Sequence, residues 1–89
     1  MKAIVTVIGK DQVGIIAGVC TLLAAQGVNV LDISQTIMQE YFTMIMLVDV
    51  SACEISFAEL ADQLEHAGTE QNLSIRIQRE DIFNAMHRI

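Results

Sequence analysis

The chain has 89 residues, of which 53% are hydrophobic and 18% charged, and its formal net charge is −6. This length fits one domain over residues 1–89, since no Pro/Gly/Ser-rich stretch or change in composition divides it. The acidic balance disfavours nucleic acid as a partner, because affinity for phosphates comes from clustered Lys and Arg. No apolar run reaches the roughly 20 residues of a membrane-spanning helix. Residues 1–9 lack the layout of a signal peptide, so we expect a cytoplasmic protein without membrane contact.

The small size and low charge together predict self-association. A domain of this length hides only about 60% of the surface of its unfolded chain. Part of its large apolar fraction is therefore expected to meet a partner, most simply as a homodimer. Cys20 and Cys53 are too far apart for a CxxC motif, and without a secretory signal we expect both to be reduced thiols.

The first half of the chain predicts a strand, a helix and two further strands. Lys2 to Ile8 alternates and is rich in Val, Ile and Thr, and a polar loop from Gly9 to Gly14 follows it. The helical period begins at Ile15 and stops at Gly27. Val28 to Met38 and Tyr41 to Val50 are typical of strands, and the two residues between them suit a hairpin.

The second half predicts a helix, a strand and a short terminal helix. Ser56 and Glu59 form a capping box before a helix that we expect to end at Gly68. From Leu73 to Gln78, apolar and polar residues alternate as in a half-buried strand. The terminal helix has Asp81 as a candidate N-cap and an apolar face of Ile82, Phe83, Met86 and Ile89.

This βαββαβ order predicts an α+β fold of the ferredoxin-like type, in which two helices cover one face of a four-stranded antiparallel sheet. The other face is then bare, and Ile45 and Leu47 make it partly apolar. The terminal helix suits this face in its own chain or in a partner. A monomer whose own helix shields the sheet is the alternative to a dimer.

Two places suggest ligand chemistry. The loop from Gly9 to Gly14 leads into a helix N-terminus, where free backbone N–H groups and the helix dipole favour an anion such as a carboxylate. Its structural alternative is a turn in which Asp11 caps the helix. Asn29 and Asp32 open the second strand and offer acceptors for an ammonium group, or are simply a turn Asn and an outward carboxylate.

The residues predict neither a catalytic nor a metal site. His66 and His87 lack a second ligand at metal spacing, and no Ser/His/Asp or Cys/His set is present. The acidic residues are scattered, with Glu80-Asp81 the one adjacent pair. We therefore expect a protein that is not an enzyme and that needs no cofactor.

The run from Val5 to Ile16, with Gly27-Val-Asn-Val after its helix, resembles the opening of ACT domains, which carries an Asp, a spaced Gly and a later Asn. The segments 32–36, 41–44 and 77–89 are similar to the small free-standing ACT proteins of uncharacterised function. The resemblance implies an ACT-type fold that pairs side by side or face to face. In many relatives an amino acid binds at the pairing interface and regulates an associated enzyme.

Carried over by position, the resemblance implies a site whose loop contacts a ligand through Asp11, Gly14 and the backbone around Gln12 and Val13. Lys10 and Ile15 flank the loop, and Asn29 reaches in from the partner chain. The sequence departs from the family at Gln12-Val13, where many amino-acid-binding members carry a basic residue and then Pro. The expected function is a homodimeric amino-acid sensor. The alternative is a module that docks an enzyme or regulator without a ligand of its own.

Overall fold

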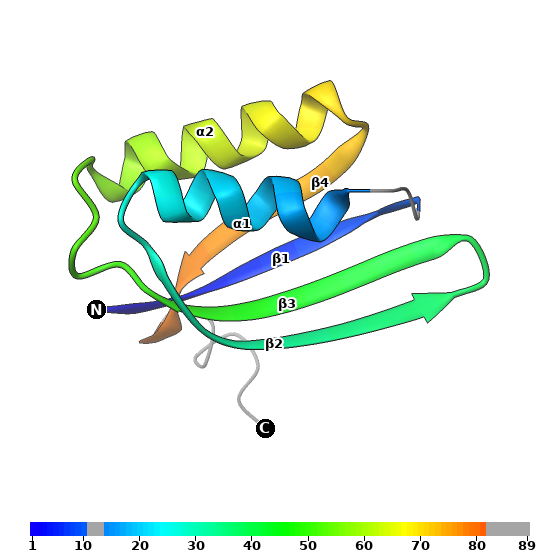
Figure 1. Cartoon of the computed structure of the whole chain (residues 1–89), viewed down its shortest axis with the longest axis horizontal. Coiled ribbons are helices and arrows are strands. Elements are labelled where there is room, and N and C mark those ends of the chain that lie inside the picture. The colour runs from blue at the N-terminus through cyan, green and yellow to red at the C-terminus, as the bar shows by residue number, and fades with distance from the viewer. Residues whose placement is uncertain (11–13, 82–89) are drawn as a thin grey trace.

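The computed structural model describes residues 1–10 and 14–81. Its elements are β1 (Lys2–Lys10), α1 (Ile15–Ala25), β2 (Asn29–Met38), β3 (Tyr41–Asp49), α2 (Phe57–Glu70) and β4 (Leu73–Arg79). The strands form one antiparallel sheet in the order β2-β3-β1-β4, and both helices lie on the same side of it (Figure 1). The predicted ferredoxin-like fold is therefore confirmed, with β2 and β4 as the two edge strands.

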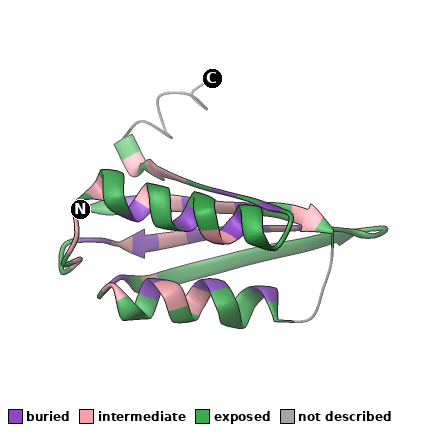
Figure 2. Cartoon of the chain, turned by 90° about the horizontal axis from the view of Figure 1, so that it is seen from above, coloured by how far each residue is buried: buried purple, intermediate pink, exposed green. Residues whose placement is uncertain are grey.

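The core lies between the helices and the sheet because alternate strand residues point to that side (Figure 2). In β3 the buried residues are Phe42, Met44, Met46 and Val48, as the alternation predicts. From the helix side, Val19, Leu23, Leu60 and Leu64 complete this cluster. Met44 and Met46 are fully buried, so these two methionines fill the core.

Glycines shape both ends of α1. Gly14 is its N-cap with φ 88°, and as a glycine it has no side chain that could form a capping hydrogen bond. The capping role considered for Asp11 falls outside the described residues. At the other end Gln26 is the C-cap and Gly27 has φ 78°, so the predicted stop is confirmed.

The beginning of α2 is as predicted, but its end is not. The backbone N–H of Glu59 donates to the hydroxyl oxygen of Ser56 over 3.1 Å, which confirms the capping box. The helix does not end at Gly68: it continues to Glu70, and Asn72, with φ 59°, takes the left-handed position instead. Position 68 holds a glycine for a different reason: a Cβ there would lie 2.7 Å from the carbonyl oxygen of Leu73. Its missing side chain lets α2 approach β4.

The face of the sheet away from the helices is partly apolar, as predicted. Ile8 and Ile45 on this face are 47% and 41% exposed. The terminal helix was expected to cover this face, but its apolar residues lie within 82–89, outside the described part of the chain. The described part ends in helical backbone at Glu80 and Asp81. Within residues 1–10 and 14–81, no helix is long and apolar enough to cross a membrane.

Candidate functional site

The loop predicted to bind a ligand joins β1 to α1 at one end of the sheet. Lys10 ends β1 and is exposed, and Gly14 is exposed at the start of α1. Ile15 is 2% exposed, so this side chain anchors the helix in the core. Asp11, Gln12 and Val13 lie outside the described residues. Among the described residues, the first turn of α1 contains no acidic residue and Gly14 has no side chain to cap it, so the N–H groups and helix dipole of this turn favour an anion.

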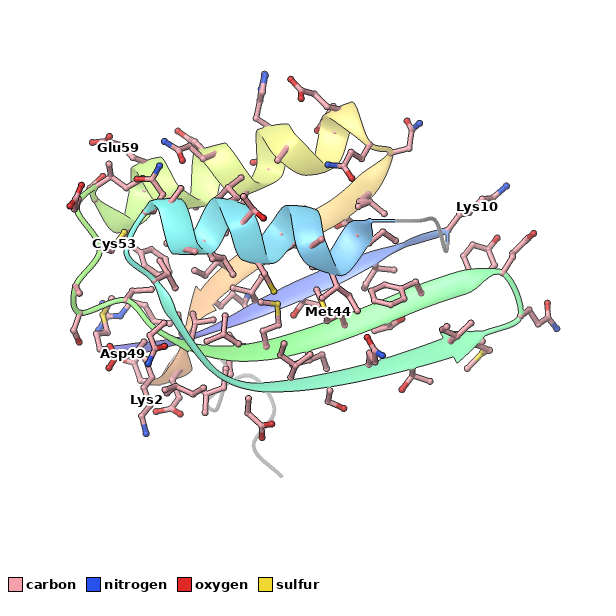
Figure 3. The ribbon with its side chains drawn as sticks, viewed as in Figure 1. Lys2, Lys10, Met44, Asp49, Cys53 and Glu59 are labelled. Atoms are coloured by element: carbon pink, nitrogen blue, oxygen red, sulfur yellow. The ribbon has the colours of Figure 1, made fainter. Side chains whose placement is uncertain are left out.

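Asn29 lies at the opposite end of the same sheet. It is the first residue of β2 and stands beside Asp49, which in turn faces Lys2 at the beginning of β1. Figure 3 shows Lys10 and Asp49 at the two ends of the sheet. The nine residues of β1 separate these ends by roughly 27 Å, at about 3.3 Å per residue. One chain therefore does not bring the loop and Asn29 together.

Asp49 adds a carboxylate beside Asn29 that the sequence analysis missed. Its Oδ1 accepts a hydrogen bond from the backbone N–H of Ser51 over 2.9 Å and lies 3.5 Å from the amino group of Met1. Hydrogen bonds from Ser51 hold the pKa of Asp49 below its ordinary value, with a smaller effect from the amino group. The side chain is thus ionised at neutral pH. Strand register, which places Asp49 opposite Asn29, is the pattern that would have found it.

The other residues considered for chemistry lie on β2 and α2. Asp32 is exposed, and its Oδ1 accepts from the next backbone N–H over 2.9 Å. His66 is exposed on α2 and lies 3.5 Å from Glu70. Within the part of the chain that the structure describes, no group of three or more His, Cys, Asp or Glu is placed to hold a metal ion. Both cysteines are free and half-buried.

A hollow of about 420 Å³ runs between α2 and the outer side of β4. Ala61, Glu65 and Thr69 form its helix wall, and residues 73–78 form its strand wall. None of the described residues of the predicted site, Lys10, Gly14, Ile15 and Asn29, lines it. The hollow is thus a feature of the β4 edge and is separate from the candidate ligand site.

The fold described above has the order of elements and the antiparallel sheet expected from the resemblance. Comparison of the sequence with models of known protein families agrees with it. The family model described as "ACT domain" matches residues 2–78. This chain belongs to the ACT domain family. A UPF0237 protein of Clostridium acetobutylicum is 60% identical to it over 89 residues, which is the full length of both chains.

Solved structures agree with this assignment. An ACT domain protein from Streptococcus pneumoniae superposes with a TM-score of 0.82 at 47% identity, and the match covers 98% of each chain. The regulatory subunit of aspartate kinase from Thermus thermophilus gives a TM-score of 0.67 at 26% identity, over 86% of this chain and 50% of that one. ACT domains are regulatory, ligand-binding modules, and this ACT domain has full-length relatives of the same small size.

Proposed function

We propose that this ACT domain binds a small amino acid as a homodimer and regulates an associated enzyme or regulator. The N-terminus of α1, where the N-cap residue Gly14 offers no side chain, carries the proposal, because its N–H groups suit a carboxylate. Asn29, with Asp49 beside it, offers the acceptors that an ammonium group requires. The likeness to a regulatory subunit of aspartate kinase supports a regulatory role in amino-acid metabolism.

The distance between Lys10 and Asn29 within one chain is the reason for proposing a homodimer. A free amino acid is only a few ångströms long, and it does not bridge two groups that are roughly 27 Å apart. The two halves form one site only if Asn29 belongs to a second chain. In this proposal the dimer has two equivalent sites, each made of the loop 10–15 of one chain and the beginning of β2 of the other.

A thermal-shift screen against the standard amino acids and small carboxylates tests this function. A ligand at about 100 times its dissociation constant stabilises the native state by about 2.7 kcal/mol. This stabilisation raises the midpoint of thermal unfolding by many degrees, since in a domain of this size each kcal/mol of added stability raises the midpoint by roughly 4–8 °C. We expect one amino acid, or a small group of them, to cause such a shift.

The variant Asn29→Ala should lose this shift while its own midpoint stays near that of the parent, because Asn29 is exposed. Gln63→Ala, on the exposed side of α2, is the matched control and should keep the full shift. Asn29→Ala is a better probe than Gly14→Ala, because the φ of 88° at Gly14 would cost alanine roughly 1–2 kcal/mol. A flat screen at millimolar concentrations would contradict ligand binding and favour the interaction module instead.

A further inference from the structure

The edge of β4 that faces away from β1 lies open beside α2. β1 pairs with one edge of β4, and among the described residues no strand pairs with the other. In an antiparallel ladder, every second residue turns its backbone N–H and C=O away from the neighbouring strand. β4 therefore presents a row of backbone donors and acceptors along this edge, next to the helix that packs on it (Figure 1).

The hollow of about 420 Å³ follows this edge. Its strand wall, residues 73–78, is about 20 Å long at roughly 3.3 Å per residue. Its helix wall is formed by Ala61, Glu65 and Thr69, whose spacing of four places them on one face of α2. Ligand sites have volumes of about 300–1,000 Å³. The hollow is therefore large enough for a ligand, and its long strand wall suits an extended chain.

The two walls of the hollow carry opposite charges. Glu65 is exposed on the helix wall, and Arg76 is exposed on the strand wall. Within the part of the chain that the structure describes, neither side chain has an ion-pair partner. Arg76 points away from the helices, because its neighbour Ile75 faces the core. A ligand in the hollow thus meets an anion on the helix side and a cation on the opposite side.

We propose that the open edge of β4 docks an extended segment of a second protein, which adds to the sheet as a further strand. The main chain of the segment hydrogen-bonds to β4, and its alternate side chains face the two walls of the hollow. On the side of α2 the segment carries a basic residue that meets Glu65, and on the other side an acidic residue that meets Arg76. Ala61 and Ile77, both half-buried, favour small apolar residues beside the basic one.

A second copy of this chain fits the edge poorly. Antiparallel pairing of two β4 strands would bring Arg76 and Arg79 of both chains onto one short ladder, and like charges close together destabilise a sheet. β4 has no acidic residue that could balance them. The charge of the edge therefore favours a segment of different sequence.

This inference rests on one part of the proposed function, the regulation of an associated protein, and names the surface where that protein docks. It does not depend on the amino-acid site, because none of the described residues of that site lines the hollow. Docking at β4 and binding of an amino acid are therefore tested by separate experiments.

Two hexapeptides of identical composition, both acetylated and amidated, test the docking edge. The first has the order Val-Thr-Lys-Glu-Val-Thr and the second Val-Thr-Glu-Lys-Val-Thr. Side chains alternate in a strand, so with the valines toward α2 the first peptide turns Lys to Glu65 and Glu to Arg76. The second peptide reverses both charges. Each is added to the isotope-labelled protein up to several millimolar, and the amide shifts are followed by NMR.

We expect the first peptide to shift the amide signals of residues 73–78 and of Ala61, Glu65 and Thr69. The second should bind several-fold more weakly, a modest difference because exposed ion pairs contribute little each. The double variant Glu65→Lys/Arg76→Glu exchanges the charges of the two walls and should reverse this preference. Both residues are exposed, so the fold should be retained, which circular dichroism checks.

The matched control is Lys2→Glu/Glu40→Lys, which makes the same exchange of charge at exposed residues outside the hollow. It should keep the preference of the parent. Equal binding of the two peptides by the parent, or a preference that Glu65→Lys/Arg76→Glu does not reverse, would overturn the occupant proposed here.

No shift with either peptide at these concentrations would overturn docking at β4, and so would shifts confined to β2. Equal shifts at β4 from the unlinked acetyl amides of lysine and glutamate would also overturn it, because a chain would then not be needed. A flat titration together with a positive amino-acid screen would remove the docking edge and leave the sensor. Shifts at β4 together with a flat screen would leave the docking edge and remove the proposed ligand.

Discussion

Leu64→Ala is expected to lower the free energy of unfolding by about 2–5 kcal/mol. Leu64 is fully buried in the part of the core that α2 contributes, so its removal leaves a cavity as well as losing the transfer free energy of its methyl groups. A small domain has only about 0.05–0.15 kcal/mol of stability per residue. The loss is therefore a large share of the total stability of this chain.

Urea unfolding followed by circular dichroism measures this loss, with all variants at one protein concentration because dimer stability depends on it. Glu65→Ala, the exposed neighbour on the same helix, is the control and should change stability by no more than about 0.5 kcal/mol. If Leu64→Ala cost as little as Glu65→Ala, the packing of α2 on the sheet described above would be wrong.

Gly68→Ala should be destabilising although it replaces glycine by the best helix former within a helix. Helix propensity alone would make the protein more stable by about 0.5–1 kcal/mol. The new Cβ, however, would lie 2.7 Å from the carbonyl oxygen of Leu73 and 3.0 Å from a side-chain carbon of Ile75. The helix must then move away from β4, and overpacking of this kind costs about 1–3 kcal/mol.

Gly18→Ala on α1 should have the opposite effect on stability from Gly68→Ala. Its Cβ would have one neighbour within 4 Å, the side-chain nitrogen of Gln71 at 3.8 Å. The propensity effect should therefore prevail, and the variant should be more stable than the parent by about 0.5–1 kcal/mol. The difference in sign between the two alanine variants, measured by thermal unfolding, separates close packing from propensity. Equal signs would contradict the contact between α2 and β4.

Local patterns were sufficient to predict the elements but not the distances between them. The capping box at Ser56 and the alternation in β3 are contained in a few neighbouring residues, and both predictions are confirmed. Gly68 was interpreted as a helix end because a glycine in that position often is one. A glycine is present there because β4 lies so close to the helix. This closeness depends on tertiary packing, and no pattern in the neighbouring residues indicates it.

The candidate site shows the same division. The residue types near the loop and at Asn29 were visible in the sequence, and the resemblance implied that they belong to two chains. Lys10 and Asn29 lie at opposite ends of one sheet because of the directions of β1 and β2. These directions could have been derived from the predicted order of elements. The exposure of β2 on both faces depends on the strand order and on how far the helices extend, so the sequence of Val28 to Met38 predicted a strand but not this exposure.

The most direct test of a site shared between two chains is binding by mixed dimers. Asn29→Ala and Asp11→Ala each remove one half of the proposed site, so neither variant should bind the amino acid found in the screen. After unfolding and refolding together in equal amounts, half of the dimers are mixed, and each of these carries one intact site. Calorimetry should then recover about a quarter of the parent's binding sites at the parent's affinity. No recovery in a mixture shown to contain mixed dimers would contradict the shared site, and so would full binding by either variant alone.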